Sequence, residues 1–218
     1  MKHTFSVVYF LLAGLYIAFI EQLPGYMGAG VKALPIVLLM FLVSWRLAGV
    51  WRSAMVVALL FSAAGDVLLA LDSGGSGDKS DSHLFIAGLG SFLMAQLVYA
   101  GLFWTHRASG QNRVGLSIFA FVFMSVAGML VVPYTGDMQA PVMAYILAIG
   151  AMLMGAAVCD RPVNRLFAGA LLFALSDLVI AVNKFIVPFA WAGIVIMATY
   201  YLAQYFIVAG VLAEADKD

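Results

Sequence analysis

The chain has 218 residues, of which 65% are hydrophobic and 10% are charged, and its mean hydropathy is +1.05. Soluble domains carry about 25% charged residues, so this composition excludes a soluble domain and indicates an integral membrane protein. The formal net charge is zero, which excludes a basic surface for nucleic acid, and the single cysteine, Cys159, excludes a disulfide framework, a four-cysteine zinc site and an iron–sulfur cluster.

Eight apolar runs have about the length that a bilayer crossing requires, which is roughly 20 residues. Because backbone groups in lipid must be hydrogen-bonded within their own segment, each run is expected to be helical. No A-x-A-like cleavage site follows the first run, so we interpret it as a retained helix. The sequence therefore predicts one all-α polytopic membrane domain, residues 1–218, with eight transmembrane helices at 4–20, 30–46, 51–71, 84–105, 114–133, 139–158, 164–183 and 188–211.

Breaks between these runs contain the expected turn and charged residues. The longest break, DSGGSGDKSDSH at 72–83, has the composition of a flexible connector. Two prolines, Pro35 and Pro141, are expected near helix starts, where proline is tolerated.

The lysines and arginines segregate when eight crossings are assumed. Three of them, Lys32, Lys79 and Lys184, fall toward one side, which the positive-inside rule makes the outer side. Both termini are then expected in the cytoplasm, and the short chain favours a bacterial inner membrane. The cytoplasmic residues would be Lys2, Arg46, Arg52, Arg107, Arg113, Arg161, Arg165 and Lys217.

A weak internal repeat relates the two halves of the chain. ALLFSAAGDVLLAL at 58–71 resembles ALLFALSDLVIAV at 170–182, and each segment contains an aspartate, Asp66 or Asp177. We expect two parallel four-helix repeats, approximately 1–106 and 107–218, with the two aspartates facing each other. Chance similarity is the alternative, since Leu, Ala and Phe recur in every membrane helix.

Asp66 and Asp177 are the acidic residues that lie well within predicted spans. An aspartate at the centre of a membrane helix costs ~2.5–3.5 kcal/mol on insertion scales, so such residues usually mark a functional site. We predict that both are catalytic in a polar cavity open to the outside; the alternative is that they only hold helices together. The neighbouring polar residues are predicted to bind substrate, and they are Lys32, Gln96, Tyr99, Tyr145, Asn183, Lys184, Tyr200 and Gln204.

Four short motifs, taken in order, resemble the YhhN-like lysoplasmalogenases over nearly the whole chain. They are Lys32-x-Leu34-Pro35, Ser62-x-x-Gly65-Asp66, Ser176-Asp177 with Asn183 and Phe185, and Thr199-Tyr200-Tyr201-x-x-Gln204. The resemblance implies hydrolysis of the vinyl ether bond of lysoplasmalogens to a fatty aldehyde and glycerophospho-ethanolamine or -choline. It also implies a lysophospholipid substrate taken from the bilayer, and it maps the family's intramembrane aspartates onto Asp66 and Asp177.

Acid–base chemistry by two carboxyl groups suits this reaction and needs no metal or cofactor, so neither is expected. Two other functions stay open at this point. One is a proton-coupled transporter of a small or lipid-like solute, because parallel repeats with paired acids also occur in carriers. The other is a membrane scaffold whose polar core only specifies packing.

Overall fold

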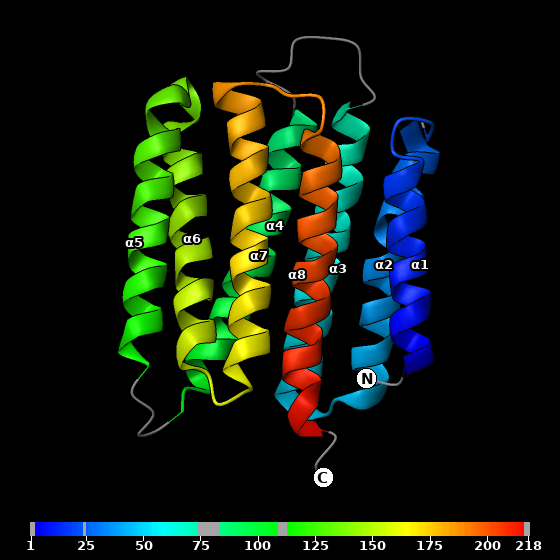
Figure 1. Cartoon of the computed structure of the whole chain (residues 1–218), viewed down its shortest axis with the longest axis vertical. Helices are drawn as coiled ribbons and strands as arrows, with labels where there is room; N and C mark the ends of the chain where they lie inside the picture. The colour runs from blue at the N-terminus through cyan, green and yellow to red at the C-terminus, as the bar shows by residue number, and fades with distance from the viewer. Residues whose placement is uncertain (1–2, 24, 74–82, 109–112, 216–218) are drawn as a thin grey trace. The chain divides into compact units, whose positions relative to one another are not determined.

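The computed structural model describes all residues except 1–2, 24, 74–82, 109–112 and 216–218 (Figure 1). The described residues form helices and contain no β-strand; Arg107 and Cys159 form an isolated bridge. The α-helices are α1 (His3–Ala18), α2 (Gly25–Arg46), α3 (Gly49–Ser73), α4 (His83–Thr105), α5 (Val114–Val131), α6 (Gln139–Val158), α7 (Val163–Ala181) and α8 (Ala192–Ala215). Two 3₁₀ turns, Val132–Tyr134 and Gly136–Met138, connect α5 to α6, and a π turn, Val182–Ile186, follows α7.

The predicted all-helical membrane protein is confirmed. Seven helices, α2 to α8, are long and apolar enough to cross a bilayer. The remaining predicted span, 4–20, corresponds to α1, which is apolar but has only 16 residues. At 1.5 Å per residue it is about 24 Å long, shorter than the ~30 Å hydrocarbon core.

Two predicted helix starts are wrong. Helix α2 begins at Gly25, about five residues earlier than expected, so Pro35 lies inside the helix and Lys32 lies two turns from its start. Glycines weaken a helix in water, but in lipid the need to pair backbone groups outweighs that cost. Helix α8 begins at Ala192, about four residues later than expected, and Val187 before Pro188 is extended. Pro141 lies near the start of α6, as predicted.

Some predictions fall on residues that the structure does not describe. Of the predicted 72–83 connector, Asp72 and Ser73 belong to α3 and His83 begins α4, while 74–82 lie outside the described residues. The predicted positions of Lys2, Lys79 and Lys217 also lie outside them.

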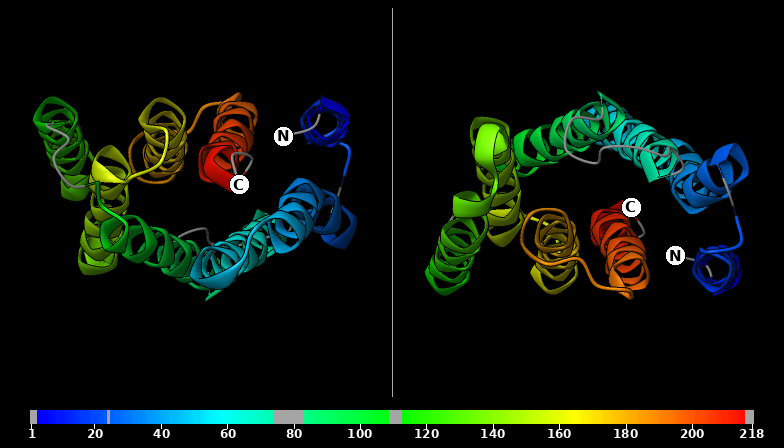
Figure 2. Two further views of the ribbon diagram at one scale, coloured as in Figure 1. Left: turned by 90° about the horizontal axis from the view of Figure 1, so that it is seen from below. Right: turned by 90° about the horizontal axis from the view of Figure 1, so that it is seen from above.

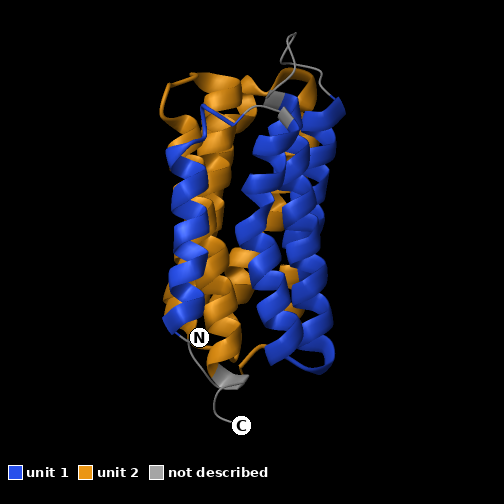
Figure 3. Cartoon of the chain, turned by 90° about the vertical axis from the view of Figure 1, so that its right-hand side faces the viewer, with its two compact units in different colours: residues 1–98 blue, residues 99–218 orange. Residues whose placement is uncertain are grey.

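The chain divides into two compact units, Met1–Val98 and Tyr99–Asp218, and α4 contributes to both (Figure 3). Within the first unit, α2 packs against α1 and α3. Within the second unit, α5 packs against α6, α6 against α7, and α7 against α8 (Figure 2). The predicted repeat halves, 1–106 and 107–218, stay a prediction.

Glycines permit close helix contacts on both aspartate-bearing helices. A Cβ at Gly65, directly before Asp66, would lie 2.6 Å from the Phe92 ring of α4. A Cβ at Gly169 would lie 2.7 Å from the backbone nitrogen of Ile207 in α8. Each aspartate is therefore carried by a helix that lies close to a neighbour.

Candidate active site

Asp66 forms a buried ion pair within the first unit. Its side chain, on α3, is 1% exposed, and its Oδ1 lies 3.6 Å from the Nζ of Lys32 on α2. Lys32 reaches this position because α2 begins early and packs along α3. The ammonium group thus balances a carboxylate charge that would be costly to bury alone.

Tyr16 of α1 is also close enough to the Asp66 carboxylate to interact with its charge. The side chain of Tyr16 is buried. Tyr16 was not predicted as a site residue, because a tyrosine in an apolar helix is most simply explained by packing. Its seven-residue spacing from Tyr9, which is also buried, was the available signal that both share one inward face.

Asp177 accepts a hydrogen bond within the second unit. The hydroxyl of Tyr145, on α6, donates to Oδ2 of Asp177, on α7, over 2.9 Å. Both side chains are buried, with Asp177 7% exposed. The packing of α6 against α7 therefore orients one oxygen of this carboxyl group through a neutral donor.

A second buried hydrogen bond joins two other predicted site residues. The Tyr99 hydroxyl on α4 donates to Oε1 of Gln204 on α8 over 2.9 Å. The Tyr200 ring, one turn before Gln204, packs edge-on against Phe173 of α7. Gln96, one turn before Tyr99, is also fully buried. The structure thus joins Tyr99 to Gln204 by a hydrogen bond and buries Tyr200 and Gln96.

Asn183 and Lys184 lie in the π turn after α7 and are half-buried. The Asn183 Oδ1 accepts a hydrogen bond from the Phe189 backbone N–H over 3.1 Å, so this side chain stabilises the connection to α8. Because a π turn contains an extra residue, it rotates the following side chains relative to those of α7. The spacing of Lys184 from Asp177 is therefore not that of a regular α-helix.

Ser176 supports the Asp177 side of the site, although sequence analysis treated it only as part of a motif. Its hydroxyl donates to the Ile196 carbonyl over 3.0 Å and links α7 to α8. The signal was a small polar residue directly beside an intramembrane aspartate. Among the described residues, no three His, Cys, Asp or Glu side chains gather as metal ligands would.

Known proteins resemble this chain over most of its length. The model of a family described as the YhhN family matches residues 27–211. A lysoplasmalogenase of Mycobacterium tuberculosis is 33% identical over 164 residues, which cover 73% of this chain and 60% of that protein. This chain therefore spans less than two thirds of that relative's length. No solved structure matches the chain.

Two animal proteins are similar over a larger share of both chains. Lysoplasmalogenase TMEM86B of Sus scrofa is 30% identical over 204 residues, or 93% of this chain and 83% of that protein. Lysoplasmalogenase TMEM86A of Homo sapiens is 32% identical over 206 residues, or 88% and 81%. The similarity thus includes both aspartate-bearing helices.

Proposed function

The chain belongs to the YhhN family, and from that premise we propose that it hydrolyses the vinyl ether bond of lysoplasmalogens by acid–base chemistry of Asp66 and Asp177. Its products would be a fatty aldehyde and glycerophospho-ethanolamine or -choline. The names of its relatives support the reaction. The observation that carries the assignment of residues is the burial of two carboxyl groups, each within a helix able to span a membrane.

The proposed reaction starts with a proton on carbon. Protonation of the alkene carbon that does not bear oxygen leaves a cation stabilised by the ether oxygen. Water adds to the cationic carbon and loses a proton, and the resulting hemiacetal collapses to an aldehyde and an alcohol. One carboxylic acid can supply the first proton, and one carboxylate can stabilise the cation and accept the proton of water, as in glycoside hydrolysis.

We assign the carboxylate role to Asp66 and the acid role to Asp177. The Lys32 ammonium, 3.6 Å from Oδ1, stabilises a negative charge on Asp66. Asp177 then supplies the proton, and Tyr145 orients its carboxyl group by donating to Oδ2. The remaining predicted site residues, Gln96, Tyr99, Asn183, Lys184, Tyr200 and Gln204, would bind the lysophospholipid.

We also propose that the site lies in the periplasmic half of a bacterial inner membrane, with both termini in the cytoplasm. In the second unit, the described arginines lie at one end of the helices, and Lys184 follows the opposite end of α7. Loops rich in arginine stay in the cytoplasm, so this distribution supports the orientation. The arginines are Arg107, Arg113, Arg161 and Arg165.

Aldehyde release from a defined lipid tests the proposal. Purified protein is incubated with a 1-alkenyl lysophosphatidylethanolamine and, separately, with its saturated 1-alkyl analogue. Only the alkenyl lipid should release aldehyde. Asp66→Asn and Asp177→Asn should each lower kcat by about 10²–10⁴-fold, the usual contribution of a general acid or base.

Asp137→Asn is the matched control, because Asp137 is exposed in the turn before α6. It changes the same chemical group away from the site and should retain wild-type turnover. Normal turnover by both folded aspartate variants would overturn the mechanism. Substrate-driven proton movement across liposomes without aldehyde would instead indicate a carrier.

A further inference from the structure

A groove between α5 and α6 lies at the arginine-rich end of the second unit, whereas Asp177 lies toward the other end of α7. Its volume is about 360 Å³, within the range of ligand pockets. The polar lining consists of Arg113 and Ser117, and the apolar lining includes Ile118, Phe121, Met154 and Val158. All of these residues belong to one unit.

The lining of the groove becomes wholly apolar with depth. Helix α5 runs away from Arg113, so Phe121, eight residues later, lies about 12 Å deeper along the axis. Helix α6 ends at Val158, so Met154 lies one turn deeper on the other wall. The groove therefore has Arg113 at its mouth with Val114 and Val158, Ser117 one turn deeper beside Ile118, and only apolar side chains below them; Ile118 and Phe121 are exposed.

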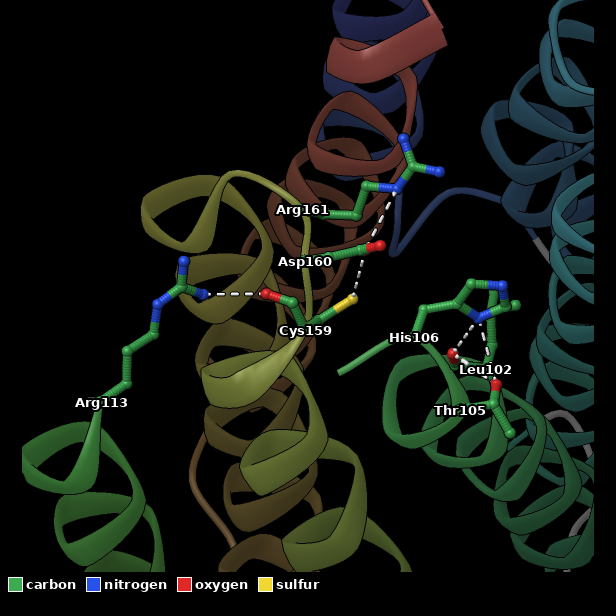
Figure 4. A network of polar contacts seen from close by, with 7 residues as sticks. All are labelled: Leu102, Thr105, His106, Arg113, Cys159, Asp160 and Arg161. Carbon is green, nitrogen blue, oxygen red and sulfur yellow. Dashed lines mark hydrogen bonds and ion pairs between the residues drawn. The ribbon is translucent and has the colours of Figure 1, made fainter. Parts of the chain in front are cut away.

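Hydrogen bonds hold the mouth of the groove in place. The Nη1 of Arg113 donates to the Cys159 carbonyl over 2.9 Å (Figure 4). It also donates to the Ala157 carbonyl over 3.4 Å. The backbone N–H of Ala108 donates to Val158, and that of Asp160 donates to His106. The last carbonyls of α6 are thus paired with the α4–α5 connection, and the guanidinium is fixed at the end of both helices.

Charge at this end favours an anion. Arg107 and Arg161 lie in the connections at this end, and Arg165 lies in the first turn of α7. Asp160 is the acidic residue that the structure describes among them. Its Oδ1 lies 3.6 Å from Nε of Arg161. An apolar groove with a basic mouth between membrane helices matches a phospholipid in shape and charge, because an acyl chain can lie along the walls while its phosphate meets the arginine.

From this arrangement we infer that the α5–α6 groove is a binding site for an anionic phospholipid of the surrounding bilayer. One acyl chain lies against Ile118, Phe121 and Met154, and the phosphate contacts Arg113 and Ser117. The site is separate from the proposed hydrolysis, since none of these residues takes part in it. The bound lipid would reinforce the contact between α5 and α6.

Lipid retention measured by native mass spectrometry tests this site. Delipidated full-length protein is titrated with phosphatidylglycerol or with phosphatidylcholine of identical acyl chains. The wild type should bind one phosphatidylglycerol in clear preference to phosphatidylcholine. Arg113→Gln should weaken phosphatidylglycerol binding about fivefold or more, since it removes a charge-assisted contact between the guanidinium group and the phosphate.

Two further variants make the result specific. Arg165→Gln removes the same charge from an exposed residue at the start of α7 and should change binding less than twofold. Ile118→Trp fills the groove while leaving Arg113 and its bonds to α6 intact, and it should abolish selective binding even if Arg113→Gln fails to fold.

Equal retention of the two lipids would overturn the inference, because the groove would then accept any acyl chain. An equal effect of Arg113→Gln and Arg165→Gln would indicate diffuse attraction instead of a site. Unchanged binding by Ile118→Trp, or a dimer that buries the groove without lipid, would overturn it as well.

Discussion

Asp66 lies 3.6 Å from the ammonium group of Lys32, whereas Asp177 accepts a 2.9 Å hydrogen bond from the hydroxyl of Tyr145. The two aspartates follow similar ALLF-containing sequences and are both buried, so the helices that carry them do not explain the difference. The difference comes from the preceding helix, which supplies lysine from α2 in one unit and tyrosine from α6 in the other. A similar motif can thus be given two chemical environments by residues of the preceding helix.

Removing each partner should give the clearest contrast between the two environments. Lys32→Met leaves a buried carboxylate without its ammonium partner and should lower the free energy of unfolding by about 3–5 kcal/mol. Tyr145→Phe removes one hydrogen bond between membrane helices and should cost only about 0.6 kcal/mol, with a maximum near 1.7. Unfolding in mixed micelles measures both values.

The double variant Lys32→Met/Asp66→Asn provides the control, because it removes the charge and its partner together. It should recover most of the stability lost by Lys32→Met alone. Equal losses for Lys32→Met and Tyr145→Phe would show that the two environments do not differ in charge.

Cys159 offers a way to ask which unit a variant loosens. Burial, with the adjacent Asp160 carboxylate adding a smaller effect, raises the pKa of the Cys159 thiol from its ordinary value of 9.0 to about 11. Because the thiolate is the reactive form, its fraction at pH 8 is about 100-fold lower than at the ordinary pKa. Alkylation of the folded wild type should be slow by at least that factor and should rise about tenfold per pH unit up to pH 10.

Cys159 belongs to the second unit and is the only cysteine of the chain. For a given loss in the free energy of unfolding, Tyr145→Phe should therefore accelerate alkylation of Cys159 more than Lys32→Met does. Mass spectrometry measures the labelling. Rapid labelling of the untreated wild type at pH 8 would contradict the burial of this thiol.

Alanine substitutions of the two glycines that face neighbouring helices, Gly65 and Gly169, should differ more modestly in their effect on stability. At Gly169 an added Cβ meets backbone atoms of α8, at 2.7 Å from Ile207 and 2.9 Å from Ala203, which cannot move without shifting the helix. At Gly65 it meets the Phe92 ring, which can rotate. Gly169→Ala should therefore cost about 1–3 kcal/mol, and Gly65→Ala should cost less.

Gly90→Ala is a suitable control for this pair, because nothing lies within 4 Å of its added Cβ and alanine favours helix. It should be neutral or slightly stabilising when the thermal unfolding of all three variants is measured. A larger loss at Gly65 than at Gly169 would mean that the contact of α3 with α4 is the more rigid one.

The apolar runs predicted the helices well because in lipid a helix is the simplest way to pair every backbone group. The starts of α2 and α8 were less predictable, since a helix can continue through glycines in lipid, and a proline is compatible with a helix start without requiring one. Asp66, Lys32, Tyr145 and Asp177 could also be predicted as site residues, because charged or polar groups are rare in these apolar runs.

Pairings were beyond the reach of a single sequence. The bonds from Tyr145 to Asp177 and from Tyr99 to Gln204 depend on which helices are neighbours and on their rotation. The π turn that contains Asn183 was not predicted either, because a single extra residue in a helix leaves no mark in the apolar pattern. Tyr16 was missed for a similar reason, as its closeness to Asp66 follows from how α1 packs.

The burial of the lone thiol makes the protein convenient for spectroscopy. Cysteines introduced at exposed ends of α3 and α7 would accept spin labels while Cys159 stays silent, so the native residue need not be removed. Electron–electron distances between such labels would measure how far apart the two aspartate-bearing helices stand in a lipid nanodisc, with and without a bound ether lipid.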